Sequence, residues 1–344
     1  LFFFLMANVL TSSLTATNLA GSKQVEQIVM QQEAPTEVDL KAQAPGYPPL
    51  FWLPHLITQT IYGSGGEASG LQPAVAASAS REQVHIATTR AVAILSHLAI
   101  VLGVVVIGYR HFDNIKTGIA VATLYLLLPY TAQYTAHVDH GLPAALLVWA
   151  VATYRRPVVA GLFMGLAIGV SYYPAFLLPL WFSFYGQRGL LRFGIGVVLA
   201  IFALIVSLAI MTGFQMDILL PYLRQMFGLR WPIMENLHGV WQFRSIDPVY
   251  RIPILAAFVV LCVSFAIWPA QKNLGTLISC SAAGMLATQF WHAHGGGLYM
   301  AWYLPLLIMT IFRPNLEDRV AVATLGEGWR PKWYAHRGGS ESVM

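Results

Sequence analysis

The chain has 344 residues, of which 57% are hydrophobic and only 10% charged, with a formal net charge of +5. Soluble globular domains carry about 25% charged residues, so this composition excludes an ordinary soluble domain. Lys and Arg occur mostly at the ends of apolar runs and form no dense basic segment, so we expect no nucleic-acid partner. The two cysteines, Cys262 and Cys280, lie in apolar runs and are expected to be inert packing residues.

Long apolar runs predict an all-α fold, a polytopic transmembrane helical bundle with about ten spanning helices. The first run covers residues 1–10 and is typical of the end of a span, so we expect the natural protein to begin upstream of Leu1. The stretch 47–57, YPPLFWLPHLI, is too short and too rich in proline to span, and it predicts a re-entrant or interfacial segment. The other expected spans cover residues 86–109, 118–134, 141–154, 158–172, 174–185, 193–213, 252–270, 276–290 and 299–312.

Positive charge alternates between the short loops. The loops HVDH, SYYP and HAHGGG carry no Lys or Arg. By the positive-inside rule, the basic loops and the tail 313–344 are cytoplasmic, and an even number of helices places the N-terminus there too. The sequence therefore predicts a single transmembrane domain over residues 1–312 in a bacterial inner membrane, with long loops 11–85 and 214–251 on the periplasmic or extracellular face. The basic residues of the alternate short loops are Arg110, Lys116, Arg155, Arg156, Arg188, Arg192 and Lys272.

The HVDH loop is the first candidate for chemistry. His137, Asp139 and His140 stand where one predicted helix leaves the membrane and the next returns. An Asp between two imidazoles can serve as a general base, a proton relay or part of a metal site. The alternative is a polar turn in which Asp139 caps the returning helix. We assign no metal ligand and no cofactor from the sequence, and a divalent cation stays an open option.

The segment WHAHGGG forms the second candidate, in the short outer turn before the last span. Trp291 can stack on a sugar ring, and the glycines let backbone approach a ligand beside His292 and His294. The alternative is an aromatic anchor at the membrane interface next to a flexible turn.

Four arginines on the expected outer side could contact a phosphate. The loop from about residue 220 predicts an amphipathic helix followed by a segment rich in Trp and Arg, and its guanidinium groups suit a phosphate head group or anchoring to anionic lipid. Arg90, just inside the span 86–109, either has a partner there or extends to the interface. The arginines of the loop are Arg224, Arg230 and Arg244.

Several stretches together resemble a known family. The chain resembles the polytopic C-type-fold glycosyltransferases, most closely the family 87 lineage of polyprenyl-phosphate-sugar-dependent mannosyltransferases. The resemblance covers about three-quarters of the chain in short hydrophobic motifs. These motifs are GYPPLFWLP (46–54), TTRAVAILSHLAIVLGVVVIG (88–108), the region GLPAALLVWAVATYRRPVVAGLFMGLAIGVSYYPAFLLPLWF (141–182), ENLHGVWQFR (235–244) and FWHAHGGGLYMAWYLPLLI (290–308).

The resemblance implies an inverting sugar transfer on the outer face from a polyprenyl phosphate in the membrane. An acid of the first outer loop acts as the base on the acceptor hydroxyl, and Arg and His of later loops hold the phosphate. We expect Asp39 or Asp139 to be the catalytic acid. The expected substrate-binding residues are Tyr47, Arg90, His137, His140, Arg230, Asn236, Arg244, Trp291, His292 and His294.

One departure from the family keeps other functions open. Family members carry an acid soon after the first span, whereas here no acid occurs between Leu10 and Glu26, and Asp39 is the nearest substitute before Tyr47, followed by Glu37. Either the base has moved to Asp39 or Asp139, or the protein is catalytically altered. The alternatives are a non-enzymatic membrane subunit built on a transferase-like scaffold, with partners in a membrane protein complex, and a transporter for a lipid or solute.

Overall fold

A computed structural model of the chain describes residues 1–31, 48–62, 73–227, 241, 247–268, 272–291, 299–314, 316 and 320. Within these residues the fold is helical, and it contains no strand apart from an isolated bridge between Asn273 and Val320. The predicted all-α class is confirmed. The helices, in chain order, are α1 (Phe2–Thr11), α2 (Ala16–Glu26), α4 (Pro48–Tyr62), α5 (Pro73–Arg110), α6 (Ile115–Leu127), α7 (Pro129–Gln133), α8 (Val138–Ala152), α9 (Pro157–Val170), α10 (Leu178–Tyr185), α11 (Leu190–Met211), α12 (Met216–Met226), α13 (Arg251–Ile267), α14 (Leu274–Trp291) and α15 (Leu304–Phe312).

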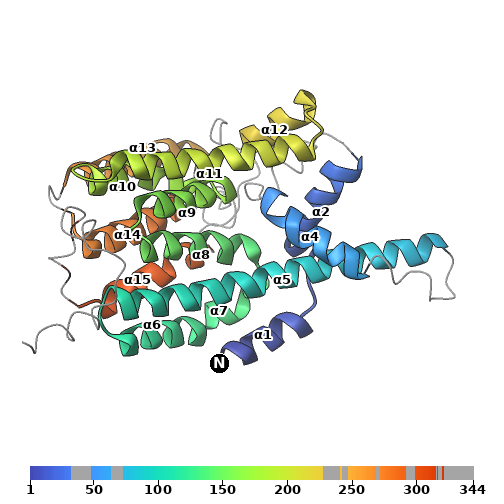
Figure 1. Ribbon diagram of the computed structural model, residues 1–344, viewed down its shortest axis with the longest axis horizontal. Coiled ribbons are helices and arrows are strands. Elements are labelled where there is room, and N and C mark those ends of the chain that lie inside the picture. The colour runs from blue at the N-terminus through green and yellow to red at the C-terminus, as the bar shows by residue number, and fades with distance from the viewer. Residues whose placement is uncertain are drawn as a thin grey trace, which may run out of the picture.

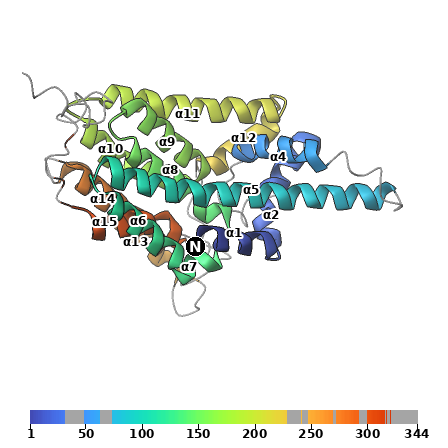
Figure 2. The same ribbon diagram turned by 60° about the horizontal axis from the view of Figure 1, so that its bottom comes forward.

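The longer helices lie side by side along the long axis of the molecule (Figure 1). Helix α11 packs on α9, α9 on α8, α8 on α5 and α5 on α6, while α15 contacts both α6 and α14. Helices α2 and α4 pack near the N-terminal part of α5, at the opposite end from α10 and α14 (Figures 1 and 2). The expected outer loop 11–85 is therefore partly helical. The described residues also contain four short helical elements: η1 (Gln27–Gln31), η3 (Tyr173–Leu177), η5 (Pro248–Tyr250) and η6 (Met300–Trp302).

Three helical segments are long and apolar enough to cross a membrane. They are Arg81–Arg110 within α5, Leu190–Met211, which is α11, and Pro248–Ile267, which comprises η5 and α13. Large apolar side chains on α11 and α13 are exposed, among them Leu191 and Val260, as expected of helices that meet lipid rather than water. The described residues thus support a membrane-associated helical bundle.

The sequence predicts about ten spanning helices, but most helices in the described residues are shorter than the three segments named above. Prolines explain several of the shorter elements, because a proline suits the first turn of a helix but cannot continue one. The expected span 118–134 is divided at Pro129 into α6 and α7. The expected spans 174–185 and 299–312 each begin with a turn of 3-10 helix, followed by the short helices α10 and α15.

Helices α9 and α11 approach each other through glycines. A Cβ atom added at Gly161 would lie 2.2 Å from the carbonyl oxygen of Phe193, and one added at Gly196 would lie 2.1 Å from that of Val158. Small residues of this kind allow helix backbones to pack closely in membrane proteins. A larger residue at Gly161 or Gly196 would therefore push the two helix backbones apart.

A second hydrophobic core holds the part of the molecule where α1, α2 and α4 meet α5, α8 and α11. Its buried side chains come from all six of these helices, together with η1 and α12. They include Val9, Ile28, Phe51, Val92, Val138 and Leu208. Because Val92 and Val138 belong to the same cluster, α5 near Arg90 lies beside the beginning of α8. This packing positions the polar groups described next.

Candidate functional site

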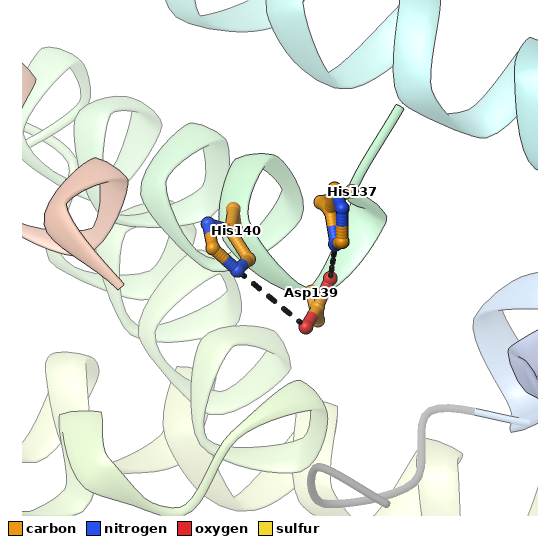
Figure 3. A group of neighbouring side chains, drawn as sticks. All are labelled: His137, Asp139 and His140. Atoms are coloured by element: carbon orange, nitrogen blue, oxygen red, sulfur yellow. Dashed lines mark ion pairs between the residues drawn. The ribbon is translucent and has the colours of Figure 1, made fainter. Parts of the chain in front are cut away.

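The HVDH residues come together at the start of α8 (Figure 3). His137 Nδ1 lies 3.7 Å from Asp139 Oδ1, and His140 Nε2 lies 3.8 Å from Asp139 Oδ2. The side chains of His137 and Asp139 are 28% and 22% exposed, whereas that of His140 is buried. The N-cap residue of α8 is His137, which makes no side-chain capping bond, and Asp139 lies in the first turn, where the helix dipole favours a carboxylate. The carboxylate therefore lies between two imidazoles, as the sequence suggested.

Groups from α7 and the C-terminal segment fix this turn. Tyr130 Oη lies 2.6 Å from His140 Nδ1 and accepts a hydrogen bond of 3.2 Å from the backbone N–H of Ala301. The indole N–H of Trp302 donates to the carbonyl oxygen of Asp139 at 2.9 Å. Aromatic rings enclose the His140 imidazole, with Tyr134 stacked at 4.8 Å and Tyr299 at 4.6 Å between centroids.

A second polar cluster joins α2 to α5, and the sequence analysis did not anticipate it. His85 Nε2 lies 2.7 Å from Glu26 Oε2, and His85 Nδ1 lies 2.8 Å from Ser22 Oγ. Arg81 Nη1 lies 3.7 Å from the other carboxylate oxygen, Glu26 Oε1. Ser22 and His85 are buried, whereas the side chain of Glu26 is 17% exposed. The arrangement holds one carboxylate in a fixed orientation with an edge open to solvent.

Helix α4 contributes His55 to this second cluster. Its Nδ1 lies 3.4 Å from Ser22 Oγ, and its ring stacks on that of His85 with centroids 5.7 Å apart. Burial lowers the pKa of His55 below its ordinary value, the neighbouring His85 lowers it further, and Glu26 opposes both effects. One turn farther along, the hydroxyls of Thr58 and Thr88 lie 2.6 Å apart. Side chains of α2, α4 and α5 therefore meet in one polar cluster, and Thr58 and Thr88 form a further polar contact between α4 and α5.

An apolar pocket of about 410 Å³ lies between α4, α5, α8 and α9. Its lining includes Pro54 of α4 and Leu142 of α8, the helices that carry His55 and His140, but none of the residues of the two polar clusters. Val92 of α5 also lines it, whereas Arg90, two positions earlier on the same helix, does not. The remaining walls are apolar apart from Ser96. The pocket has the character of a binding site for a hydrocarbon chain.

Arg90 lies on α5 between the two clusters. Its Nη2 donates to the carbonyl oxygen of Ser12 at 3.1 Å, and its Nε is buried and has no hydrogen-bond partner among the described residues. A buried guanidinium N–H without a partner is costly, which favours a ligand at this position. The expectation that Arg90 binds substrate stays a prediction.

Trp291 is buried in a hydrophobic core cluster that also contains Tyr173, Phe258 and Trp302. Its carbonyl oxygen accepts hydrogen bonds from Arg251 Nε at 3.2 Å and from Arg251 Nη2 at 2.8 Å. Its ring packs against Tyr173 and Phe258, at 5.3 Å and 5.6 Å between centroids. This environment suits a packing residue, and Trp291 reaches the HVDH turn only through intervening aromatic rings.

The described residues leave out most of the other predicted site residues. Arg224 lies exposed in the last turn of α12, the amphipathic helix that the sequence predicted. Asp39, Tyr47, Arg230, Asn236, Arg244, His292 and His294 lie outside the described part of the chain.

Comparisons with known proteins returned nothing: the chain matches no family model, no curated protein and no solved structure. Functional inference therefore starts from the two polar clusters and the apolar pocket.

Proposed function

We propose that the protein is an integral membrane glycosyltransferase of C-type architecture, with about ten membrane-crossing segments and both termini in the cytoplasm. In this proposal it transfers a sugar, mannose or a close analogue, from a polyprenyl phosphate to an acceptor on the periplasmic side of a bacterial inner membrane. The observation that carries the proposal is that α5 and α8 supply both lining residues of the apolar pocket and the polar side chains of Arg90, His85 and Asp139. This combination matches a substrate with a hydrocarbon chain at one end and a charged, reactive group at the other.

In this proposal the apolar pocket holds the isoprenoid chain of the donor, and Arg90 holds its phosphate. The isoprenoid chain would lie along the apolar wall formed by Val92, Leu142 and Pro54. Its phosphate would then lie near Arg90, whose buried Nε–H donates to no acceptor among the described residues. A cationic donor at this point stabilises the negative charge that develops on the phosphate as the sugar leaves.

Glu26 is the carboxylate best arranged to act as the base. Its Oε2 is fixed by His85, and its partial exposure leaves it within reach of an acceptor hydroxyl. Glu26 would take the hydroxyl proton while the acceptor oxygen bonds to the sugar carbon and the carbon–phosphate-oxygen bond breaks. Glu26 is also the first acid after the first apolar run. In this proposal it acts as the catalytic base, the role that we expected of Asp39 or Asp139.

The test is sugar transfer by purified protein in liposomes that contain a synthetic polyprenyl-phosphate mannose and a membrane extract as the acceptor source. We expect Glu26→Gln to lower transfer by at least about 100-fold, since general base catalysis contributes about 10²–10⁴. Glu82→Gln is the matched control, because Glu82 is an exposed acid near the same end of α5.

Two further variants separate the proposed base from the predicted ones. Asp39→Asn and Asp139→Asn are assayed in parallel with Glu26→Gln. A large loss in Asp39→Asn with an active Glu26→Gln would transfer the role of base to Asp39. If native mass spectrometry finds only ordinary phospholipids together with stable protein partners, and no donor is turned over, the non-enzymatic subunit becomes the better account.

A further inference from the structure

We propose that His137, Asp139 and His140 bind a divalent transition-metal cation of the zinc class. Each of the three residues offers one donor atom, and these atoms all lie within 4.8 Å of one another. Two imidazole nitrogens and one carboxylate oxygen form a donor set that suits zinc and its first-row neighbours. The inference does not depend on the proposed sugar transfer.

The separations between the donor atoms suit a shared ion better than a direct hydrogen bond. The nitrogens of His137 and His140 lie 3.7 Å and 3.8 Å from the Asp139 oxygens, beyond the usual range for an N–H···O bond. Zinc ligands lie about 2.0–2.2 Å from the ion, so two of them at a tetrahedral angle are about 3.4 Å apart. The two imidazoles point at the carboxylate from different sides (Figure 3), and small rotations close the set around an ion.

The surroundings of His140 are those of a metal ligand. A ligating histidine usually donates its second ring N–H to an oxygen, which fixes the tautomer and the ring orientation. Tyr130 Oη lies 2.6 Å from His140 Nδ1, so Nδ1–H can donate to this oxygen while the Nε2 lone pair faces Asp139. The same tyrosine oxygen has a second lone pair for the N–H of Ala301.

The site is bordered by protein on one side and open on the other. His140 is buried under Tyr134 and Tyr299, whereas His137 and Asp139 remain partly exposed. Three protein ligands with an accessible face leave coordination positions for water or a substrate oxygen, as in catalytic rather than structural zinc sites. The positive end of the α8 dipole opposes a cation there, and the negative charge of Asp139 offsets it.

Cobalt binding provides a direct readout, because Co²⁺ replaces Zn²⁺ at such sites and reports coordination in its visible spectrum. The full chain is purified with a tag that contains no histidine and is stripped of metal with a chelator. It is then titrated with Co²⁺ and displaced with Zn²⁺. We expect saturable binding of one ion per chain, lost in His137→Gln and in Asp139→Asn. Tyr130→Phe should weaken binding by about 10–100-fold, the usual effect of removing the partner of a ligating histidine.

Two controls keep the result interpretable. The double variant His292→Gln/His294→Gln removes the other histidines expected near this face and should bind Co²⁺ like the wild type. Gel filtration shows whether each variant remains folded, and His137→Gln, at a partly exposed position, is the variant least affected by packing. Absence of saturable Co²⁺ binding in the wild type would overturn the proposal. So would unchanged binding in folded His137→Gln and Asp139→Asn.

Discussion

His85 connects Glu26 and Ser22 through opposite nitrogens of one imidazole, at 2.7 Å and 2.8 Å. Ser22 and Glu26 belong to α2 and His85 belongs to α5, two helices that are far apart in the sequence but in contact in the structure. The histidine is buried between them. One ring therefore both fastens α2 to α5 and orients the carboxylate that we propose as the base.

Removing His85 should destabilise the protein. His85→Ala removes the partner of Glu26 Oε2 and leaves the Ser22 hydroxyl with only its longer contact to His55, and a buried polar group left unsatisfied costs about 1–3 kcal/mol. We expect a lower melting temperature in detergent, measured by intrinsic fluorescence. Gln83→Ala, at an exposed position two residues earlier on α5, should leave it nearly unchanged.

The pH dependence of stability should carry a contribution from His55. Its folded-state pKa is lowered, so the unfolded chain binds the proton more readily. This contribution is fully present above the unfolded-state pKa of about 6.5 and is lost as pH falls from there through the folded-state pKa. We expect the melting temperature to fall on acidification, with a shallower slope in His55→Gln. Equal slopes in the two proteins would contradict this account.

The contact between α9 and α11 should not tolerate a methyl group. In Gly196→Ala the new Cβ meets the carbonyl oxygen of Val158, and overpacking of this kind costs about 1–3 kcal/mol. Gly194 lies two residues earlier on the same helix, with no neighbouring atom within 4 Å of an added Cβ. Because alanine favours helix over glycine by about 1 kcal/mol, Gly194→Ala should be neutral or stabilising in the same thermal assay.

Filling the apolar pocket should reduce donor binding without changing the polar clusters. Ala99 lines the pocket on α5, and Ala99→Phe places a ring in the space proposed for the isoprenoid chain. A photoreactive polyprenyl phosphate should then label the protein at least about tenfold less, a change of about 1.4 kcal/mol in binding. Val260→Phe places the same ring at an exposed position of α13 that does not line this pocket, and its labelling should match the wild type.

The predicted topology can be tested with cysteines. In a variant that lacks Cys262 and Cys280, a new cysteine at Asp247 should react with a membrane-impermeant maleimide in intact cells. One at Gln187 should react only after permeabilisation. Both positions are exposed, so a difference in labelling reports the side of the membrane rather than burial. The reverse pattern would invert the whole predicted orientation.

The sequence predicts the parts of this molecule that depend on local pattern. Long apolar runs indicate helices, and the HVDH spacing alone brings His137, Asp139 and His140 into one turn. Several expected spans are shorter helices in the described residues, because prolines such as Pro129 end or restart helices inside continuous apolar runs.

The Glu26–His85 contact could not be read from the sequence in the same way. Its partners are 59 positions apart and belong to a region for which the sequence predicts a polar loop. Only the packing of α2 and α4 against α5 brings them together. The one available signal was that Glu26 is the first acid after the first apolar run, and nothing nearby in sequence identifies its partner.

The length of α5 gives the molecule a mechanical property. At 38 residues the helix is about 57 Å long, whereas the hydrocarbon core of a bilayer is about 30 Å thick. If the segment Arg81–Arg110 crosses the membrane, the remaining residues 73–80 are a rigid lever arm that begins next to the Glu26 cluster. A tilt of about 10° around the midpoint of α5 moves the Pro73 end by roughly 5 Å, estimated from the rise per residue. Changes in bilayer thickness or lateral pressure would thus be converted into movement of the Glu26 cluster relative to the start of α8.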